Sequence, residues 1–183
     1  EQLGYDAGYV YDHFIPYYGD KRTMPFFEAY TLLSAIASVT SKLRIGQVVT
    51  CNSYRSPALL AKMSSTLDAI SNGRLEFGIG AGWFEYEYNS YGYRFDNAST
   101  RIEQLDESIT IIKKMWQKEK SNFKGRHYFV KNAICSPKPI QKPHPPIMVG
   151  GAGQKLISVV AKHATRYNYP FGTPEILQDV RTG

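Results

Sequence analysis

The sequence predicts an α/β protein whose strands form one parallel sheet. Strand-like and helix-like segments alternate along the 183 residues, an order typical of a parallel barrel or a doubly wound sheet. The expected strands also end in polar or glycine-rich segments, namely Asp12-His13, Gly78-Ile79-Gly80-Ala81-Gly82 and Gly150-Gly151-Ala152-Gly153. Glycine weakens a strand and usually marks the close approach of a ligand or of another backbone. These ends favour a barrel with a binding site along one rim.

Parallel strands are expected near residues 8–12, 43–50, 75–80, 146–150 and 165–169, where β-branched, aromatic and glycine residues gather. Helices are expected near residues 26–41, 57–71, 100–118 and 154–163, because apolar residues recur there every three or four positions. Strands and helices therefore alternate as successive units, with one excursion after the third of these helices.

Local signals predict where the helices begin and end. Pro25 is expected in the first turn of the first helix, and Ser56-Pro57 predicts an N-cap and an N1 proline for the second. Asn72-Gly73 supplies a left-handed stop for that helix. Thr100 and Glu103 form a capping-box pattern at the start of the third helix.

The remaining segments are expected to be less regular. Residues 83–97 predict an irregular, aromatic-rich loop, and residues 122–129 predict a small hairpin that turns at Lys124-Gly125. Residues 1–4 are typical of the last turn of a helix closing on Gly4, and a further helix is expected to begin near Thr173. We therefore expect the chain to be an interior piece of a longer protein.

Composition excludes several classes of function. The net charge of +6 is spread thinly, whereas a nucleic-acid face would need tighter grouping, so we expect no nucleic-acid partner. Cys51 and Cys135 have neither CxxC nor zinc spacing, which predicts free thiols, no metal site and a reducing compartment. No apolar run approaches the ~20 residues of a membrane helix, and no leader-like segment opens the chain. The cytoplasm is the expected location.

Longer motifs resemble the bacterial luciferase-like monooxygenase family, and most closely its coenzyme F420-dependent branch. The resemblance is carried, in the family's order and spacing, by VYDHF, LRIGQVVTCNSYRSPALLAKMSSTLDAISNGRLEFGIGAGWFEYEYNSYG, TRIEQLDESITIIKKMW, FKGRHYFV and PKPIQKPHPPIMVGGAG. It implies a (β/α)8 TIM barrel that binds F420, or alternatively FMN, and transfers a hydride to or from a small organic substrate. We expect residues 1–183 to be one such domain, truncated at both ends, with about five parallel strands. Relatives are commonly dimers, so a homodimer is expected.

Asp12 and His13 are the candidate catalytic residues. An Asp-His pair at the end of a barrel strand suits acid/base or binding work, because barrel active sites lie at that rim. The alternative is that His13 only caps a loop. The family resemblance implies that this pair approaches the deazaflavin ring, where a histidine could hold or relay a proton.

The resemblance also implies a set of cofactor-binding residues. It places a non-prolyl cis peptide under the ring, a glycine strand end against the cofactor, a phosphate loop at a helix N-terminus, and one residue of the last strand nearby. Free N–H groups before a helix bind anions, which supports the phosphate loop independently, whereas the other glycines could merely permit turns. In order along the chain, these residues are Val48, Val49, Gly80, Ala81, Gly82, Gly150, Gly151, Ala152, Gly153 and Asn168.

Some positions depart from the family pattern. Trp83 stands where certain members carry an acidic residue for sugar phosphates, which argues against glucose-6-phosphate chemistry. Glu87 is a weaker candidate for that acidic residue, because a carboxylate in an aromatic loop is often just solvated, and Thr165-Arg166 stands where relatives usually have an acidic residue. Two alternatives to an active enzyme stay open. One is a non-catalytic barrel with a degenerate site, and the other is an inert fragment whose edge strands, near Tyr9 and Thr165, are unpaired.

Overall fold

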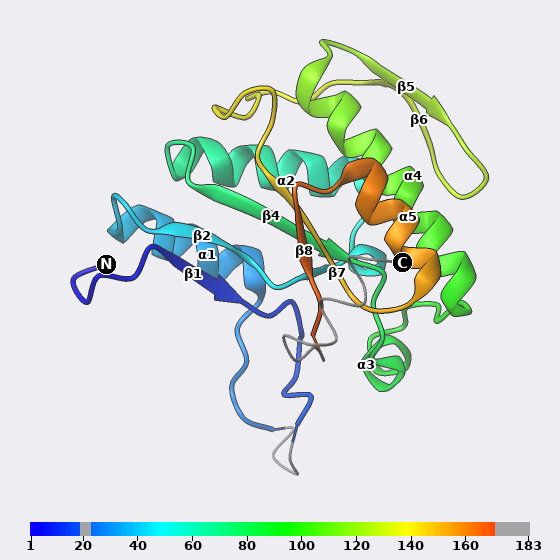
Figure 1. Ribbon diagram of the computed structural model, residues 1–183, viewed down its shortest axis with the longest axis horizontal. Helices are drawn as coiled ribbons and strands as arrows, with labels where there is room; N and C mark the ends of the chain where they lie inside the picture. Colours follow the sequence, from blue (N-terminus) through cyan, green and yellow to red (C-terminus); the bar gives the residue numbers. More distant parts are fainter. Residues whose placement is uncertain (19–22, 171–183) are drawn as a thin grey trace.

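The computed structural model describes residues 1–18 and 23–170, which form a curled half-barrel of parallel strands (Figure 1). Adjacent strands pair in parallel throughout, which confirms the predicted sheet. Residues 48–49 interrupt the second strand of the prediction, so that it becomes β2 and β3. In spatial order the strands are β1 (Ala7–Val10), β2 (Arg44–Gln47), β4 (Leu75–Gly80), β7 (Ile147–Gly150) and β8 (Arg166–Asn168), with β3 (Thr50–Cys51) paired to β4.

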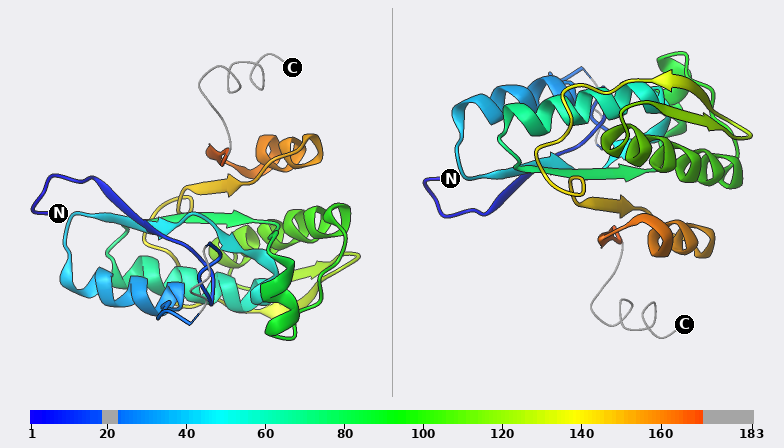
Figure 2. Two further views of the ribbon diagram at one scale, coloured as in Figure 1. Left: turned by 90° about the horizontal axis from the view of Figure 1, so that it is seen from below. Right: turned by 90° about the horizontal axis from the view of Figure 1, so that it is seen from above.

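In the described part of the chain, four helices cover the outside of the sheet. The contacts run from α1 to α2, from α2 to α4 and from α4 to α5, and Figure 2 shows α1, α2 and α4 on one side of the strands. Their bounds are α1 (Ala29–Val39), α2 (Pro57–Ile70), α4 (Ala98–Gln117) and α5 (Gln154–His163). Among the residues that the structure describes, no helix is both long and apolar enough to cross a membrane.

Strand β4 divides the interior because its side chains alternate between two faces. Phe77 and Ile79 belong to the hydrophobic core formed with the helices, where the Phe77 ring meets Trp116 edge-on at 5.1 Å between centroids. Glu76, on the opposite face of β4, accepts hydrogen bonds from Tyr9 and Arg166, which lie on the two outermost strands. The glycines of β4 therefore face the inside of the half-barrel, at the level where its strands end.

Two predicted helix starts are corrected by the caps that the chain uses. The first helix begins at Ala29 rather than at residue 26, because the Glu28 carboxylate accepts hydrogen bonds from the N–H groups of Tyr30 (3.1 Å) and Thr31 (2.7 Å). Pro25 consequently lies before the helix. The helix α4 begins at Ala98, since the Asn97 side chain accepts the Thr100 N–H at 3.0 Å, and the predicted capping box at Thr100 is wrong.

Other local predictions are confirmed. Helix α2 begins at Pro57 with the Ser56 hydroxyl capping it, and Asn72, at φ 54°, follows its end. The predicted hairpin is the antiparallel pair β5 (Ser121–Lys124) and β6 (Phe129–Ala133). Residues 83–97 are more regular than predicted, because they contain a short helix, α3 (Glu85–Ser90). The short 3-10 helix η1 (Asn52–Tyr54) follows β3.

The expectations for the two ends of the chain have different outcomes. The helix turn expected at residues 1–4 is instead a simple turn, in which the Gly4 N–H donates to the Glu1 carbonyl at 3.1 Å. Gly4 has a φ of 79°, as expected for a turn glycine. The helix expected near Thr173 lies outside the described residues.

Arg74 ties the helices to the start of the sheet. Its guanidinium is nearly buried and donates to the carbonyl groups of Ala37 (2.8 Å) and Thr40 (2.9 Å) at the end of α1. It also donates to the carbonyls of Leu43 (2.8 Å) and Ser71 (2.6 Å), just before β2 and just after α2. One side chain therefore satisfies carbonyl groups that a helix end and two loops would otherwise leave unpaired.

We expect the substitution Arg74→Met to lower the free energy of unfolding by about 2–4 kcal/mol, because several buried carbonyl groups lose their donor. The matched control is Arg126→Met, since the Arg126 side chain is 78% exposed and should contribute less than about 1 kcal/mol. Urea unfolding followed by circular dichroism measures both. Equal transition midpoints for the two variants would contradict the role given to Arg74.

Candidate functional site

One cavity of about 830 Å³ lies at the carboxyl ends of the parallel strands. Its volume is within the range typical of small-molecule and cofactor sites. The structure brings nearly all of the predicted site residues to its lining, and only Gly153 is absent from it. The predicted residues that line it are Asp12, His13, Val48, Val49, Gly80, Ala81, Gly82, Gly150, Gly151, Ala152 and Asn168.

Asp12 is held by a buried ion pair. Its carboxylate, 3% exposed, accepts two hydrogen bonds from the Arg55 guanidinium, at 2.7 and 2.9 Å, and a third from the Cys51 N–H at 2.9 Å. Burial opposes the charge of Arg55, but Asp12 and Glu28 raise its pKa overall. Because both oxygens of Asp12 are occupied, this geometry favours a structural role that joins β1 to β3, in place of the acid/base role predicted from sequence.

His13 is held by Glu87, which was only a weaker candidate in the sequence. The carboxylate is not solvated, because Glu87 is fully buried. Its carboxylate accepts hydrogen bonds from His13 Nδ1 (2.8 Å), from the Tyr54 hydroxyl (2.5 Å) and from the N–H groups of Phe14 (2.6 Å) and Ile15 (3.2 Å). Burial alone would raise the pKa of Glu87, but these hydrogen bonds, led by His13 and Tyr54, lower it. The carboxylate is therefore ionised near neutral pH.

Aromatic side chains surround His13. Its ring lies 4.7 Å from the Tyr17 ring and meets the rings of Trp83 (6.0 Å) and Phe84 (5.9 Å) edge-on, with all distances between centroids. All three aromatic residues also line the cavity. This part of the cavity presents ring faces and edges to a bound molecule and limits the rotation of the imidazole.

The glycines of the strand ends make room for Val49. A Cβ atom on Gly80 would lie 2.8 Å from a Val49 methyl group, and one on Gly150 would lie 2.7 Å from the other. The peptide bond between Val48 and Val49 is cis, as the family resemblance predicted. Glycine is therefore required here by the protein's own packing, before any ligand is considered.

Gly82 and Cys51 close the cavity beside Tyr88. A Cβ atom on Gly82, which has a φ of 78°, would lie 1.9 Å from the Tyr88 hydroxyl. Burial raises the pKa of the Cys51 thiol to about 12, so this sulfur carries its proton and is not a nucleophile. Both cysteines are free and buried, which confirms the prediction of free thiols.

The loop after β7 offers fewer free N–H groups than the sequence predicted. Gly150 belongs to the sheet, and the Gly151 N–H donates to the Asn168 carbonyl at 3.1 Å. The N–H groups of Ala152 and Gly153 have no hydrogen-bond partner within residues 1–18 and 23–170. These two N–H groups come just before α5. The first turn of α5 lies beside the first turn of α4, where Lys155 Nζ donates to Ser99 Oγ at 3.1 Å. Two positive helix ends thus meet at this side of the cavity.

Arg101 is a cavity residue that sequence reasoning missed. It lies in the first turns of α4, is 9% exposed, and stacks over the Phe95 ring with its Cζ 4.1 Å from the centroid. One terminal nitrogen donates to the Asp96 carbonyl. Its Nε is buried and has no hydrogen-bond partner in the described part of the chain. Arg101 lines the cavity beside two helix N-termini, and its positive charge there favours an anionic ligand group.

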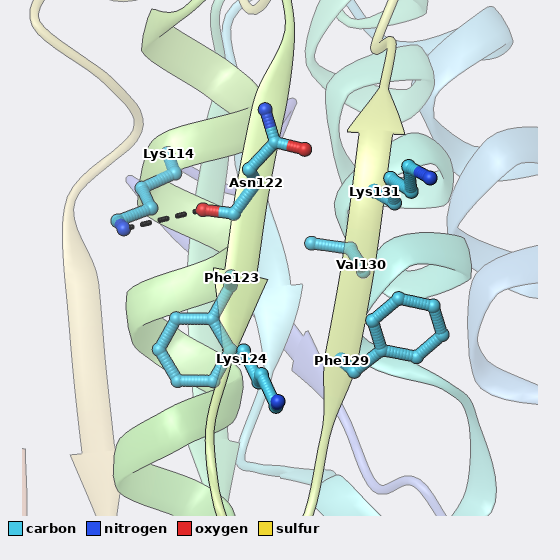
Figure 3. Close-up of a pocket in the computed structure, with 7 residues that line it drawn as sticks. All are labelled: Lys114, Asn122, Phe123, Lys124, Phe129, Val130 and Lys131. Atoms are coloured by element: carbon cyan, nitrogen blue, oxygen red, sulfur yellow. Dashed lines mark hydrogen bonds between the residues drawn. The ribbon is translucent and has the colours of Figure 1, made fainter.

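A second, shallower hollow lies on the hairpin (Figure 3). It is lined by lysine and apolar side chains of α4, β5 and β6, and Lys114 Nζ donates to the Asn122 carbonyl there at 3.4 Å. None of the predicted site residues lies in it. Among the described residues, no three His, Cys, Asp or Glu side chains are placed to hold a metal ion.

Comparison with known proteins assigns the family. A family model described as luciferase-like monooxygenase matches residues 1–175. The chain belongs to the luciferase-like monooxygenase family. This confirms the resemblance found in the sequence motifs.

Relatives in this family carry out different reactions. The chain is 33% identical over 147 residues to pyrimidine monooxygenase RutA of Acinetobacter baylyi. The aligned region covers 79% of this chain and 39% of that protein. It is 32% identical over 167 residues to the F420-dependent glucose-6-phosphate dehydrogenase of Amycolatopsis mediterranei. Here the aligned region covers 91% of this chain and 48% of that protein. The chain thus spans about half, or less, of the length of these curated relatives.

Solved structures confirm the luciferase-like barrel fold. An F420-dependent secondary alcohol dehydrogenase in complex with an F420-acetone adduct matches 97% of this chain and 53% of its own, with a TM-score of 0.87 and 24% identity. A type II Baeyer–Villiger monooxygenase of Pseudomonas putida in complex with FMN matches 82% of this chain and 42% of its own, with a TM-score of 0.67 and 23% identity. At these identities the likeness shows the fold.

We expect Gly80→Ala to destabilise the protein in the absence of any cofactor, by about 1–3 kcal/mol, because the added methyl group collides with Val49 and with the Gly150 carbonyl. The matched control is Gly8→Ala on β1, where the added methyl group meets only Leu43 at an ordinary 3.4 Å. Thermal unfolding without ligand measures both variants. A Gly80→Ala protein as stable as Gly8→Ala would show that packing does not require glycine at position 80.

Proposed function

We propose that the protein containing this chain is an oxidoreductase or monooxygenase that binds F420 or FMN in the cavity at the strand ends. The proposal depends on two features that this one cavity combines. One is His13, an aromatic-lined histidine at the end of β1, and the other is the set of unsatisfied donors near α4 and α5, namely Arg101 and the N–H groups of Ala152 and Gly153. A flavin or deazaflavin needs both a planar apolar surface and an anion anchor. The residues present fit such a group.

The anionic end of the cofactor would lie at the loop after β7. The free N–H groups of Ala152 and Gly153, the Arg101 guanidinium and the first turns of α4 and α5 supply positive potential there. Backbone N–H groups at a helix start bind phosphate in many nucleotide sites. This assignment keeps the predicted phosphate loop, Gly150–Gly153, but limits its donors to the N–H groups of Ala152 and Gly153.

The reactive end would lie over Val49 and near His13. When bound, the cofactor would supply hydride transfer to or from a small organic substrate. The chain's own contribution is to shape the floor with Val49, to bring the backbone of Gly80–Gly82 close, and to exclude water with Tyr17, Trp83 and Phe84. His13 is the residue placed to hold or move a proton.

Titration of the purified protein with F420 and with FMN, followed by fluorescence, tests the proposal. Saturable binding of one of them supports the proposal that the protein is an enzyme. Oxygen consumption with the reduced cofactor then separates a monooxygenase from a dehydrogenase or reductase. Binding of neither cofactor favours the two alternatives, a barrel with a degenerate site or an inert fragment.

We expect Ala152→Glu to raise the dissociation constant of the cofactor at least tenfold, about 1.4 kcal/mol. A carboxylate at this exposed position would repel the anionic group at the helix ends. Ala152→Gln has nearly the same shape without the charge, and should change the dissociation constant less than about threefold. Fluorescence titration of both variants gives the comparison.

Position 152 is a better probe than its neighbour. Gly151 has a φ of 136°, and a Cβ atom there would lie 2.9 Å from Leu156, so a side chain at Gly151 would disturb the fold as well as the ligand. If Ala152→Glu and Ala152→Gln bind the cofactor equally well, the anion site is not at this loop.

A further inference from the structure

We propose that Glu87 is a positioning residue that fixes the protonation state of His13, so that the Nε2 atom of His13 is the proton acceptor facing the cavity. The proposal rests on the proposed function, because it concerns the residue assigned there to hold a proton. It starts from the hydrogen bonds of the buried Glu87 carboxylate and from the chemistry of imidazole.

Glu87 draws three separate segments together. It is carried by the short helix α3, whereas His13, Phe14 and Ile15 belong to the segment after β1, and Tyr54 belongs to η1. The two N–H groups of Phe14 and Ile15 both donate to Oε1, and the Tyr54 hydroxyl and His13 Nδ1 meet Oε2. The carboxylate is therefore fixed from both sides, and it fixes the imidazole in turn.

The charge state of Glu87 determines where the proton of His13 lies. Burial would raise the pKa of Glu87, yet the hydrogen bonds that it accepts lower the pKa overall, so the carboxylate is ionised. An ionised carboxylate can only accept hydrogen bonds. The His13 nitrogen at 2.8 Å from it must therefore carry a hydrogen. In a neutral imidazole the other nitrogen, Nε2, is then an acceptor with a free lone pair.

The remaining surroundings of His13 leave Nε2 available. Tyr17, Trp83 and Phe84 contact the imidazole through their rings. Within the described residues, Nε2 has no hydrogen-bond partner. The titratable groups nearby are already engaged. Asp12 pairs with Arg55. Burial first, and then neighbours including Glu87, raise the pKa of Tyr54, which keeps its proton and donates a hydrogen bond to Glu87.

This arrangement suits a group that takes up a proton and gives it back. When Nε2 accepts a proton, the imidazole becomes a cation, and the Glu87 carboxylate at 2.8 Å stabilises that charge without moving. The same contact prevents rotation of the ring, so Nε2 stays directed at the cavity. Glu87 itself does not line the cavity and acts through His13.

The first test needs no cofactor and no substitution at Glu87. In ¹⁵N NMR spectra of the protein labelled at histidine, His13 should show Nδ1 as the protonated nitrogen and Nε2 as the unprotonated one at a pH where the ring is neutral. The chain has four histidines, and the His13→Gln spectrum identifies the signal. Finding the proton on Nε2 in the native protein overturns the proposal, whatever the protein binds.

The second test removes the charge of Glu87. Glu87→Gln keeps the size of the side chain but presents an amide that can donate to Nδ1, so the proton of His13 should move to Nε2. We expect turnover to fall at least tenfold, while the dissociation constant of the cofactor changes less than about twofold. Glu85→Gln, an exposed position on the same helix, is the matched control and should change neither quantity.

The outcomes separate this inference from the proposed function. The native protein could show the predicted tautomer and yet bind neither F420 nor FMN. That result would overturn the proposed function but leave the role of Glu87 intact. A protein that binds its cofactor but shows unchanged turnover and an unchanged tautomer in Glu87→Gln overturns the role of Glu87 alone. If Glu87→Gln does not fold, the tautomer of the native protein still decides.

Discussion

The packing of one valine against glycines is the constraint on which the site depends. The Val49 side chain occupies the space that Cβ atoms on Gly80 and Gly150 would need, and it lies 3.2 Å from the corresponding position on Gly78. Strand β4 can therefore pair with both parts of the interrupted strand, β2 and β3, and with β7, while the Val49 side chain fills the space over Gly80 and Gly150. Because Val49 also lines the cavity, the packing that closes the sheet also forms the floor of the site.

Two buried carboxylates, Asp12 just after β1 and Glu87 on α3, hold the segment that follows β1, and their partners differ in kind. Asp12 faces Arg55, a guanidinium that stays charged at every relevant pH, so the pair is fixed. Glu87 faces His13, an imidazole with a second ring nitrogen that can take up a proton, so that contact can respond to a proton. The lowered pKa of Glu87 stabilises the fold above the ordinary carboxyl pKa, and this stabilisation is lost as the pH falls through the folded-state value.

The sequence predicted the strands and their glycine-rich ends well, because periodicity and glycine placement are local signals. It missed what depends on distant partners. Glu87 lies in a six-residue helix, too short for an apolar stripe, and only the fold brings His13 to it. Arg101 left a signal, since helical spacing places it on the buried face with Leu105, where a charge needs a partner or a function. Helix α1 begins later than predicted, because the Glu28 side chain caps its first turn and Pro25 does not mark its start.

The spacing of the strands relates the two ends of the cavity. His13 follows β1 and Ala152 follows β7, and three strand intervals separate these strands in the order β1, β2, β4, β7. At about 4.8 Å per interval, the proposed proton-handling end at His13 and the proposed anion end at Ala152 lie roughly 14 Å apart along the curved sheet. A ligand that used both ends would need a planar group and a negative charge separated by a chain of several bonds. A small substrate alone cannot meet both requirements, whereas a flavin or deazaflavin phosphate can, and it would leave the aromatic lip near Trp83 for the substrate.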